Sequence, residues 1–256
     1  DLAATTGGPD ACTDCHADQT PGWAAAEAAK HHPNAGTRPH FGVALAAGRA
    51  NPVAAQGDLR VLALDETQPG LIRATALWLL SQGADASAAE EMAPLLDHED
   101  PLIRAAAIAV QQAAPPHVMA QRVGGLLDDP ERMVRIEAAK AMLTIPPARL
   151  PQDTAAGMRR AMSDWQGSLQ ARIDIPETHL VLGGMALTLR NFPAAKGAFQ
   201  EVVRMDPQRE DAWVMLARIT AAVDGSEATL AVLDEALQRI PDSPALTEMR
   251  ASIRAQ

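Results

Sequence analysis

A short segment that contains an arginine recurs three times in this chain, at an interval of 31 residues. Arg73 and Arg104 each lie in Leu-Ile-Arg-Ala, and Arg135 lies in Met-Val-Arg-Ile. The segments Leu95-Leu96-Asp97 and Leu126-Leu127-Asp128 keep the same offset. A unit of this length cannot bury its apolar face alone, so several copies must stack on one another. This part of the chain is therefore constrained to an array of similar units.

Each unit is predicted to be a helix, a short acidic loop and a second helix. Apolar side chains such as Ile103, Ala107 and Val110 recur at helical spacing, and the acidic residues suit helix N-termini. Residues 58–148 resemble HEAT-like repeats of a short type. The usual HEAT repeat has about 40–47 residues, and pairs of short, alanine-rich helices account for the smaller interval.

A second periodicity, of 34 residues, occupies the C-terminal part of the chain. Three pairs carry it: Leu182 with Leu216, Phe199 with Leu233, and Pro207 with Pro241. Small residues stand where two helices must approach closely, at Gly183, Ala195, Ala217 and Ala236. With Trp213 at the start of the second unit, these residues resemble the tetratricopeptide signature over two repeats. A polar terminal helix at 244–256 is expected to cap the stack.

The predicted fold class is all-α, because no stretch alternates apolar and polar residues between turn residues as a strand does. Pro146-Pro147 and Pro151 interrupt the last HEAT-like helix. After them comes a predicted helix over 155–170, whose apolar face carries Met158, Met162, Trp165 and Leu169. The predicted segments are an N-terminal segment, HEAT-like repeats, a helical connector and tetratricopeptide repeats with a cap, at 1–57, 58–148, 149–175 and 176–256.

The N-terminal segment contains Cys12 and Cys15, the only cysteines of the chain, and His16 follows directly. This Cys-x-x-Cys-His spacing is the attachment signal for a c-type haem. Two thiols on one helical turn add to the two vinyl groups of the haem, and the adjacent imidazole is directed at the iron. We therefore expect one covalent haem c, bound through Cys12 and Cys15, with His16 as an iron ligand.

The composition of residues 1–57 supports this expectation. Large aliphatic side chains are sparse there, the main ones being Leu2, Val43, Leu45 and Val53. Four of the seven histidines of the chain lie in the same stretch. A haem would supply the large apolar body that the side chains of this segment cannot provide.

Three other interpretations of the two cysteines stay open. A zinc site with two cysteines and two histidines would add two of His31, His32 and His40. A thioredoxin-type redox pair needs a βαβ setting, which this sequence does not show. The third interpretation is a chance match. The shortage of ordinary core residues favours haem over these alternatives.

The second axial ligand is predicted to be His40, followed by His32 and then His31. His31 and His32 end an alanine-rich helix predicted over 23–30, where a histidine also serves as a charge-compatible cap. His40 begins a second helical stretch over 41–47, which would fold back over the haem. If the chain is part of a longer protein, this ligand would come from the missing part.

The other histidines and the methionines are assigned to structural roles. His98 and His117, at loops or helix starts, are expected in solvent, and His179 is expected to pack within a tetratricopeptide helix. Methionine is a known haem ligand, but five methionines lie on apolar faces of the helices and are expected to fill the core. These are Met92, Met133, Met142, Met158 and Met185.

Two histidine ligands would saturate the iron, which then passes electrons but does not readily bind a substrate. Imidazole stabilises Fe(III) better than a thioether does, so the reduction potential is expected below that of a His/Met cytochrome. Asp10, Asp14 and Asp18 would lower it further by favouring the more positive oxidised centre, unless they form only a solvated loop. An iron without a sixth ligand would instead bind small ligands or reduce a substrate.

The chain is acidic, with a formal net charge of −10 and an isoelectric point of about 5.1. A nucleic-acid partner is disfavoured because there is no tyrosine and only 3% of residues are aromatic, and because phosphate binding needs a basic surface. No run approaches the roughly 18 apolar residues of a membrane span. The acidic surface would steer the chain to a basic patch on a redox protein or another cytochrome subunit.

The sequence around the cysteines resembles the last haem-binding motif of multihaem c-type cytochromes that carry HEAT-like and tetratricopeptide repeats. The motif runs from Gly8 to Asp18, and the segments Arg38-Pro39-His40-Phe41-Gly42 and Ala46-Ala47-Gly48-Arg49, with Trp23, resemble the stretch leading into the repeats. The resemblance implies haem attachment outside the cytoplasm, in the periplasm or an extracellular space. Family members usually have further motifs upstream, so this chain is expected to be a single-haem member or a piece of a longer protein.

Three functions of different classes are consistent with these features. The first is an electron-transfer cytochrome whose repeats dock a partner or form a homo-oligomer, rather than serving only as a spacer. The second is a redox enzyme, or a fragment or subunit of one, with an open haem site for nitrogen or sulfur oxyanions. The third is a repeat-based interaction protein in which a haem or metal only staples the N-terminus.

Overall fold

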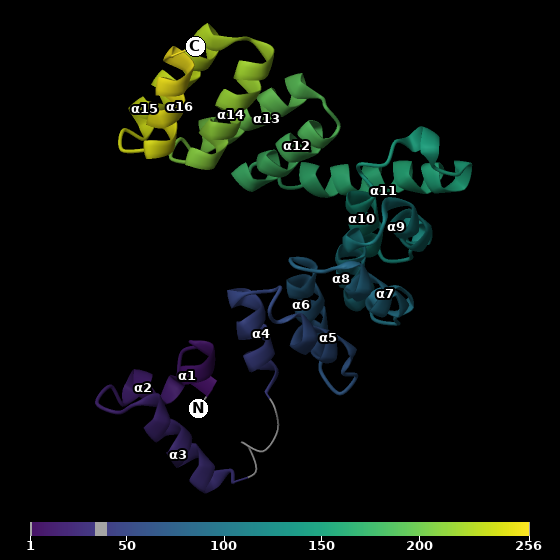
Figure 1. Ribbon diagram of the computed structural model, residues 1–256, viewed down its shortest axis with the longest axis vertical. Helices are drawn as coiled ribbons and strands as arrows, with labels where there is room; N and C mark the ends of the chain where they lie inside the picture. Colours follow the sequence, from purple (N-terminus) through teal and green to yellow (C-terminus); the bar gives the residue numbers. More distant parts are fainter. Residues whose placement is uncertain (1, 34–39, 256) are drawn as a thin grey trace. The chain divides into compact units, whose positions relative to one another are not determined.

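A computed structural model describes residues 2–33 and 40–255 of the chain (Figure 1). Its regular structure consists of α-helices and short 3-10 helices, and none of the described residues lies in a strand. The predicted all-α class is confirmed. The chain divides into two compact units, one of residues 1–142 with 150–161, and the other of residues 143–149 with 162–256.

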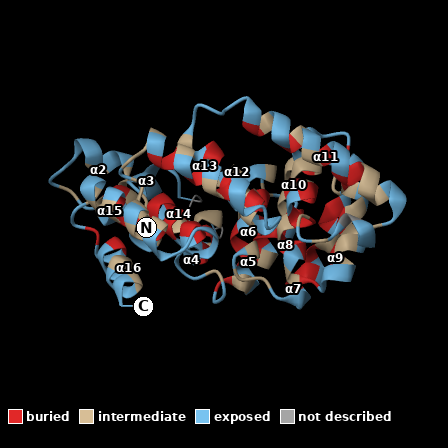
Figure 2. Cartoon of the chain, turned by 90° about the horizontal axis from the view of Figure 1, so that it is seen from above, coloured by how far each residue is buried: buried red, intermediate tan, exposed pale blue. Residues whose placement is uncertain are grey.

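The first unit begins with four helices, which are α1 (Leu2–Thr6), α2 (Ala11–Cys15), α3 (Pro21–His31) and α4 (Phe41–Ala50). Helix α1 contacts both α3 and α4, and α2 contacts α3. Ala24 is the only buried residue among the described residues 2–33, and Figure 2 shows α2 and α3 mostly in the colours of exposed and half-buried residues. Leu2 and Val53 are 43% and 65% exposed. The side chains of this segment thus form almost no core of their own.

The repeat region of the first unit consists of six α-helices with three short 3-10 turns between the later ones. The α-helices are α5 (Gln56–Leu64), α6 (Gly70–Ser81), α7 (Ala86–Met92), α8 (Pro101–Val110), α9 (Pro116–Val123) and α10 (Arg132–Ala141). The 3-10 turns are η1 (Ala93–Asp97), η2 (Gln111–Ala113) and η3 (Gly124–Asp128). Helix α6 packs on α5 and α8, and α8 packs on α10. Equivalent helices of successive units therefore lie side by side.

Two of the three repeated arginines, Arg104 and Arg135, hold the loops that precede their helices. Arg73 instead donates from Nε to the Ala63 carbonyl oxygen of α5, at 2.9 Å. Arg104 donates from Nη1 to the carbonyl oxygens of His98 and Glu99, at 2.7 and 3.0 Å. Arg135 donates in the same way to Asp129 and Pro130, at 2.8 and 2.9 Å. Buried carbonyl groups need such partners. The 31-residue interval thus reproduces one bond pattern between a helix and the loop before it.

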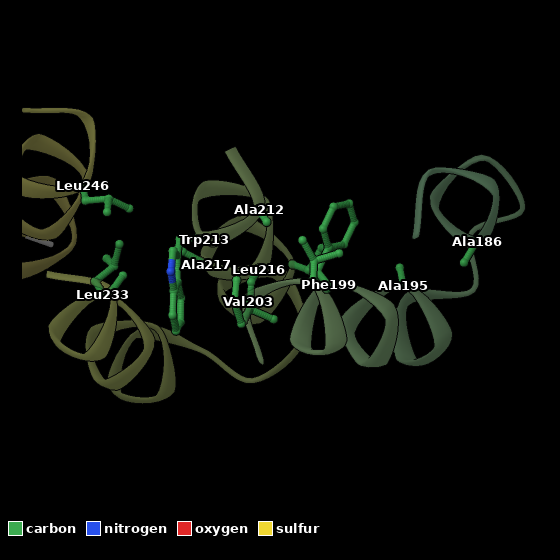
Figure 3. Packing of buried hydrophobic residues seen from close by; sticks show 13 residues of the cluster. Ala186, Ala195, Phe199, Val203, Ala212, Trp213, Leu216, Ala217, Leu233 and Leu246 are labelled. Carbon is green, nitrogen blue, oxygen red and sulfur yellow. The ribbon is translucent and has the colours of Figure 1, made fainter. Parts of the chain in front are cut away.

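The second unit contains five helices that come after α11 (Gln152–Gln170) and the 3-10 turn η4 (Pro147–Arg149). They are α12 (Pro176–Thr188), α13 (Phe192–Met205), α14 (Glu210–Val223), α15 (Ser226–Arg239) and α16 (Pro244–Arg254). Each of these five packs on the next. Figure 3 shows their shared core, in which Trp213 and Leu216 of α14 lie between Phe199 and Leu233.

Two expectations about individual repeat residues are wrong. Met133 is 42% exposed rather than buried, because α10 presents it on a face that no described element covers. His98 is half-buried rather than solvated. Its Nδ1 accepts a hydrogen bond from the Asp100 N–H, at 3.0 Å, and its Nε2 lies 3.2 Å from Nη1 of the buried Arg73. The other four methionines are buried or half-buried, as expected.

Candidate functional site

The short helix α2 carries both cysteines, and His16 follows its last residue. Asp10 begins this helix, and its Oδ1 accepts a hydrogen bond from the Cys12 N–H, at 3.0 Å. Thr13 donates from Oγ1 to the Asp10 carbonyl oxygen, at 3.1 Å. The His16 N–H donates to the Cys12 carbonyl oxygen, at 2.9 Å, so α2 ends at the histidine. Cys12, Cys15 and His16 therefore share one helical turn.

The three donor groups of this turn are accessible. Both cysteines are free thiols and are exposed. The ring of His16 lies against Trp23 of α3, with centroids 5.0 Å apart and planes inclined by 55°. This contact involves ring faces and edges, and neither ring nitrogen of His16 hydrogen-bonds to any residue that the structure describes. An imidazole held in this way keeps its nitrogens available to a metal ion.

A cavity of about 270 Å³ lies beside Cys12. Small or apolar residues of α1, α2 and α3 and of the loops between them line it: Leu2, Ala3, Pro9, Asp10, Ala11, Cys12, Pro21, Ala24, Ala25 and Ala28. The second carboxylate oxygen of Asp10 is buried here without a hydrogen-bond partner among the described residues. Cys15 and His16 do not line this cavity. The walls are thus mostly small or apolar, and only one of the two cysteines faces this cavity.

The predicted second ligand, His40, lies at a different cavity. It precedes α4 and caps that helix, since its Nδ1 accepts the Gly42 N–H at 3.0 Å. The ring of His40 also packs on Phe41, with centroids 4.2 Å apart. The cavity here measures about 430 Å³ and is lined by His40, Phe41, Val43, Ala44, Asp58, Val61, Leu62, Asp65 and Gln68. His40 and Cys12 thus face separate spaces in this structure.

The cap also determines which nitrogen of His40 carries the proton. A ring nitrogen that accepts an N–H bond is unprotonated, so Nε2 bears the proton of the neutral ring. Coordination through Nε2 requires the opposite tautomer, with the proton on Nδ1. His40 must therefore release the Gly42 N–H before it binds iron through Nε2. A side chain at position 42 would crowd the cap, because a Cβ there would lie 2.9 Å from His40 Nδ1.

The remaining histidines of the segment lie at the exposed end of α3. His31 is the last residue of the helix, and the His32 N–H donates to the Ala28 carbonyl oxygen, at 2.9 Å. Arg38 and Pro39, which belong to the predicted lead into the repeats, lie outside the described residues. Within the part of the chain that is described, no three His, Cys, Asp or Glu side chains gather into a metal-ion site.

Two supporting residues of this site were given no structural role by the sequence argument. Asp10 was considered only for its charge, although an aspartate two residues before the first cysteine matches a helix N-cap. Trp23 was noted only as part of a resemblance. Its contact with His16 depends on how α3 folds back on α2, and nothing in the local sequence specifies that angle.

Comparison with known proteins does not identify this chain, since no family model and no curated protein matches it. None of the helices in the described residues has the length and apolar character needed to cross a bilayer. The function is therefore argued from the residues of the chain itself.

Proposed function

We propose that this chain is an exported, periplasmic c-type cytochrome that transfers electrons through one covalent haem. The observation that carries the proposal is the arrangement on α2, where two free thiols and an imidazole with unbonded nitrogens occupy one helical turn. The spacing in the sequence and the accessibility in the structure point to the same group. In this proposal the HEAT-like and tetratricopeptide repeats form a solenoid that docks a partner protein.

Each residue of the site has a defined role in holding the group. Cys12 and Cys15 would form the two thioether bonds, and His16 would supply an imidazole to the iron. Asp10 fixes the start of α2, and Trp23 limits the rotation of the His16 ring. A bound haem supplies one-electron chemistry at its iron.

The lack of a core in the N-terminal segment supports the same proposal. Only one of the described residues 2–33 is buried, and segments with so little buried apolar surface do not offset their conformational entropy. A porphyrin attached through Cys12 would add a large apolar surface against the alanines of α3. Those alanines, Ala24, Ala25 and Ala28, already line the cavity beside the cysteine.

The proposal is tested by isolating the protein from a host that exports it and attaches haem c. Intact mass spectrometry should show the polypeptide plus one haem, and the Soret absorbance should survive acid-acetone extraction. Replacing both Cys12 and Cys15 by Ala should remove the added mass, whereas Asp14→Asn, between the same cysteines, should keep it. A wild-type protein with the bare polypeptide mass would refute the proposal.

A second candidate function, a redox enzyme with an open iron face, is favoured by one observation. His40 is engaged as the cap of α4 and faces a cavity separate from that of Cys12, so the first-ranked candidate for the second ligand does not face the space beside Cys12. Carbon monoxide added to the reduced protein separates the two functions. No change in the spectrum supports a six-coordinate electron carrier, and a prompt shift supports the enzyme.

A further inference from the structure

Helices α6 and α10 leave large apolar side chains in solvent along a groove that also includes α8. Leu71 and Trp78 of α6 are 66% and 57% exposed, and Met133 of α10 is 42% exposed. The groove has a volume of about 430 Å³ and runs over α6, α8 and α10. Its lining residues are Leu71, Ala74, Thr75, Trp78, Leu102, Ala105, Ala106, Ala109, Met133 and Glu137.

The shape of the groove is set by the repeat. Leu71, Leu102 and Met133 occupy equivalent positions 31 residues apart, so they form a row across the first turns of the three helices. The small side chains of the α8 alanines line the base of the groove, and Trp78 lines it toward the C-terminal end of α6. A row of apolar side chains beside an alanine floor is the form that receives the apolar face of an amphipathic helix. Exposed tryptophans are also common anchors of protein interfaces.

The loops next to this row are strongly acidic. Residues 65–69, 97–100 and 128–131 precede α6, α8 and α10, and together they contain eight carboxylates and no lysine or arginine. Asp128 and Asp129 pair with Arg160 and Arg104. Glu66, Glu99 and Glu131 are exposed. The eight carboxylates thus outnumber the arginines in the first turns of these helices, which are Arg73, Arg104, Arg132 and Arg135.

We propose that this groove binds a basic amphipathic helix of a partner protein. The apolar side chains of that helix would pack against Trp78 and the row of Leu71, Leu102 and Met133, and its lysines or arginines would face the three acidic loops. The inference rests on the docking role in the proposed function and gives that role a surface and a partner chemistry.

Charge argues against other occupants. A second copy of this chain carries a net charge of −10 and would bring like charges to the acidic loops. Nucleic acid and anionic lipid surfaces would be repelled in the same way. A cationic segment gains from both features of the groove, the apolar row and the acidic loops.

The test uses the full chain and a synthetic peptide of about 18 residues, composed of leucine and lysine with leucine at helical spacing. A control peptide keeps every leucine and replaces each lysine by glutamate. Calorimetry should show that the lysine peptide binds and the glutamate peptide does not. Binding should weaken as salt is raised, because exposed charges are screened.

Matched variants assign the binding to the groove. Trp78→Ala should weaken lysine-peptide binding by about tenfold, and changing Glu66, Glu99 and Glu131 to Gln should reduce its salt dependence. Val223→Ala removes another exposed apolar side chain, 48% exposed and in the second unit, and should have no effect. Circular dichroism verifies that each variant is folded.

Several outcomes would overturn the inference. The inference is contradicted if the lysine peptide fails to bind, if the glutamate peptide binds, or if the Trp78→Ala variant binds the lysine peptide as tightly as the wild type. A self-association of the chain that Trp78→Ala abolishes would make a second copy the occupant. None of these measurements involves haem. A chain without haem that binds the peptide as described would refute the proposed cytochrome and leave this groove as a docking site.

Discussion

At the scale of single residues, the observed role of His40 as a helix cap and its proposed role as an iron ligand exclude each other. As the cap of α4 it accepts the Gly42 N–H on Nδ1, and as an iron ligand through Nε2 it would carry a proton on that same atom. Asparagine is among the best N-cap residues and has no imidazole. His40→Asn therefore keeps the cap and removes the ligand, whereas His40→Ala removes both.

We expect both His40→Asn and His40→Ala to convert a low-spin haem spectrum to a high-spin one, because each removes the sixth ligand. In the apoprotein only His40→Ala should destabilise the first unit, by about 1 kcal/mol for a lost cap. Absorption spectra and urea unfolding measure the two effects. Low-spin spectra in both variants would show that His40 only caps the helix, and His32→Ala would then be examined.

The Cys-x-x-Cys-His motif can be recognised from the sequence alone because its residues are contiguous, and its role in binding haem stays a prediction. Cys12, Cys15 and His16 need only one helical turn to come together, and a local rule is enough to find them. The second ligand is different, because it depends on where α4 lies relative to α2. The ranking of His40 before His32 and His31 used only their places in the sequence, and the capping role of His40 becomes visible only with Gly42 beside it.

At the scale of elements, one ion pair joins two successive repeats. Arg104 of α8 donates from Nε and Nη2 to both carboxylate oxygens of Asp129, at 2.8 and 2.9 Å, and the Asp129 side chain is only 5% exposed. Breaking a buried pair leaves an uncompensated charge. Asp129→Asn should therefore destabilise the first unit by about 3 kcal/mol.

The neighbouring Asp128 provides the matched control. It pairs with Arg160, but the two side chains are 56% and 60% exposed, and exposed pairs contribute at most about 1 kcal/mol. Asp128→Asn should therefore change stability little. Urea unfolding, monitored by a probe in the first unit, compares the variants. Equal losses in the two would mean that burial of the pair is not the cause.

The contribution of Asp129 should also depend on pH. Burial acts to raise the pKa of this carboxyl, but hydrogen bonds from Arg104 and the Glu131 N–H outweigh burial, so the pKa lies below its usual value. Its stabilisation is then fully present above the unfolded value of about 3.9 and is lost as pH falls through the folded value. The difference between wild type and Asp129→Asn should shrink below about pH 4. A constant difference would contradict this.

Close packing of helices α12 and α13 depends on Gly183. A Cβ at this position would lie 2.7 Å from the Phe199 ring, whereas one at Gly184 would meet nothing within 4 Å. Gly183→Ala should force the helices apart and cost about 1–3 kcal/mol. Gly184→Ala, on the same helix, should stabilise by up to about 1 kcal/mol through helix propensity. Thermal unfolding of the second unit measures both, and stabilisation by Gly183→Ala would refute the packing argument.

Sequence periodicity predicted which small residues lie at helix contacts, but not which faces stay uncovered. Gly183, Ala195, Ala217 and Ala236 are all buried, and the 34-residue interval relates Gly183 to Ala217. Met133 has the spacing of a core residue and is nevertheless exposed. An apolar position on a helix indicates a face to be covered, and the element that covers it need not belong to the same chain.

At the scale of the whole molecule, the N-terminal segment with the two cysteines and the helices of the 31-residue repeat belong to one compact unit. Helix α4 joins them, since it packs on α1 on one side and on α5 and α6 on the other. Leu45 of α4 is 5% exposed. Residues 1–57 were assigned to a segment of their own because they are poor in aliphatic residues, yet α4 of that segment contributes to the core of the repeat helices. The change in composition does not reveal that α4 packs on these helices.

The net charge of −10 leads to a prediction about electron transfer. A cation is attracted to this surface and an anion is repelled, and raising the salt from about 0.01 M to 0.15 M shortens the screening length from about 30 Å to about 8 Å. Oxidation of the reduced protein by hexaammineruthenium(III) should therefore slow as salt is added, and oxidation by ferricyanide should accelerate. Stopped-flow absorbance measures both rates.

A variant of the acidic loops tests whether this charge acts near the haem. Changing Glu66, Glu99 and Glu131 to Gln alters the net charge from −10 to −7 in the unit that holds the haem motif. If the loops contribute to steering, both salt dependences should become shallower, because attraction and repulsion weaken together. The same change at three exposed acids of the second unit gives the same net charge and serves as the control; these are Glu227, Glu235 and Glu248. Equal effects of the two triple variants would show that only the total charge matters. If salt changed the rates with the two oxidants in the same direction, electrostatic steering itself would be refuted.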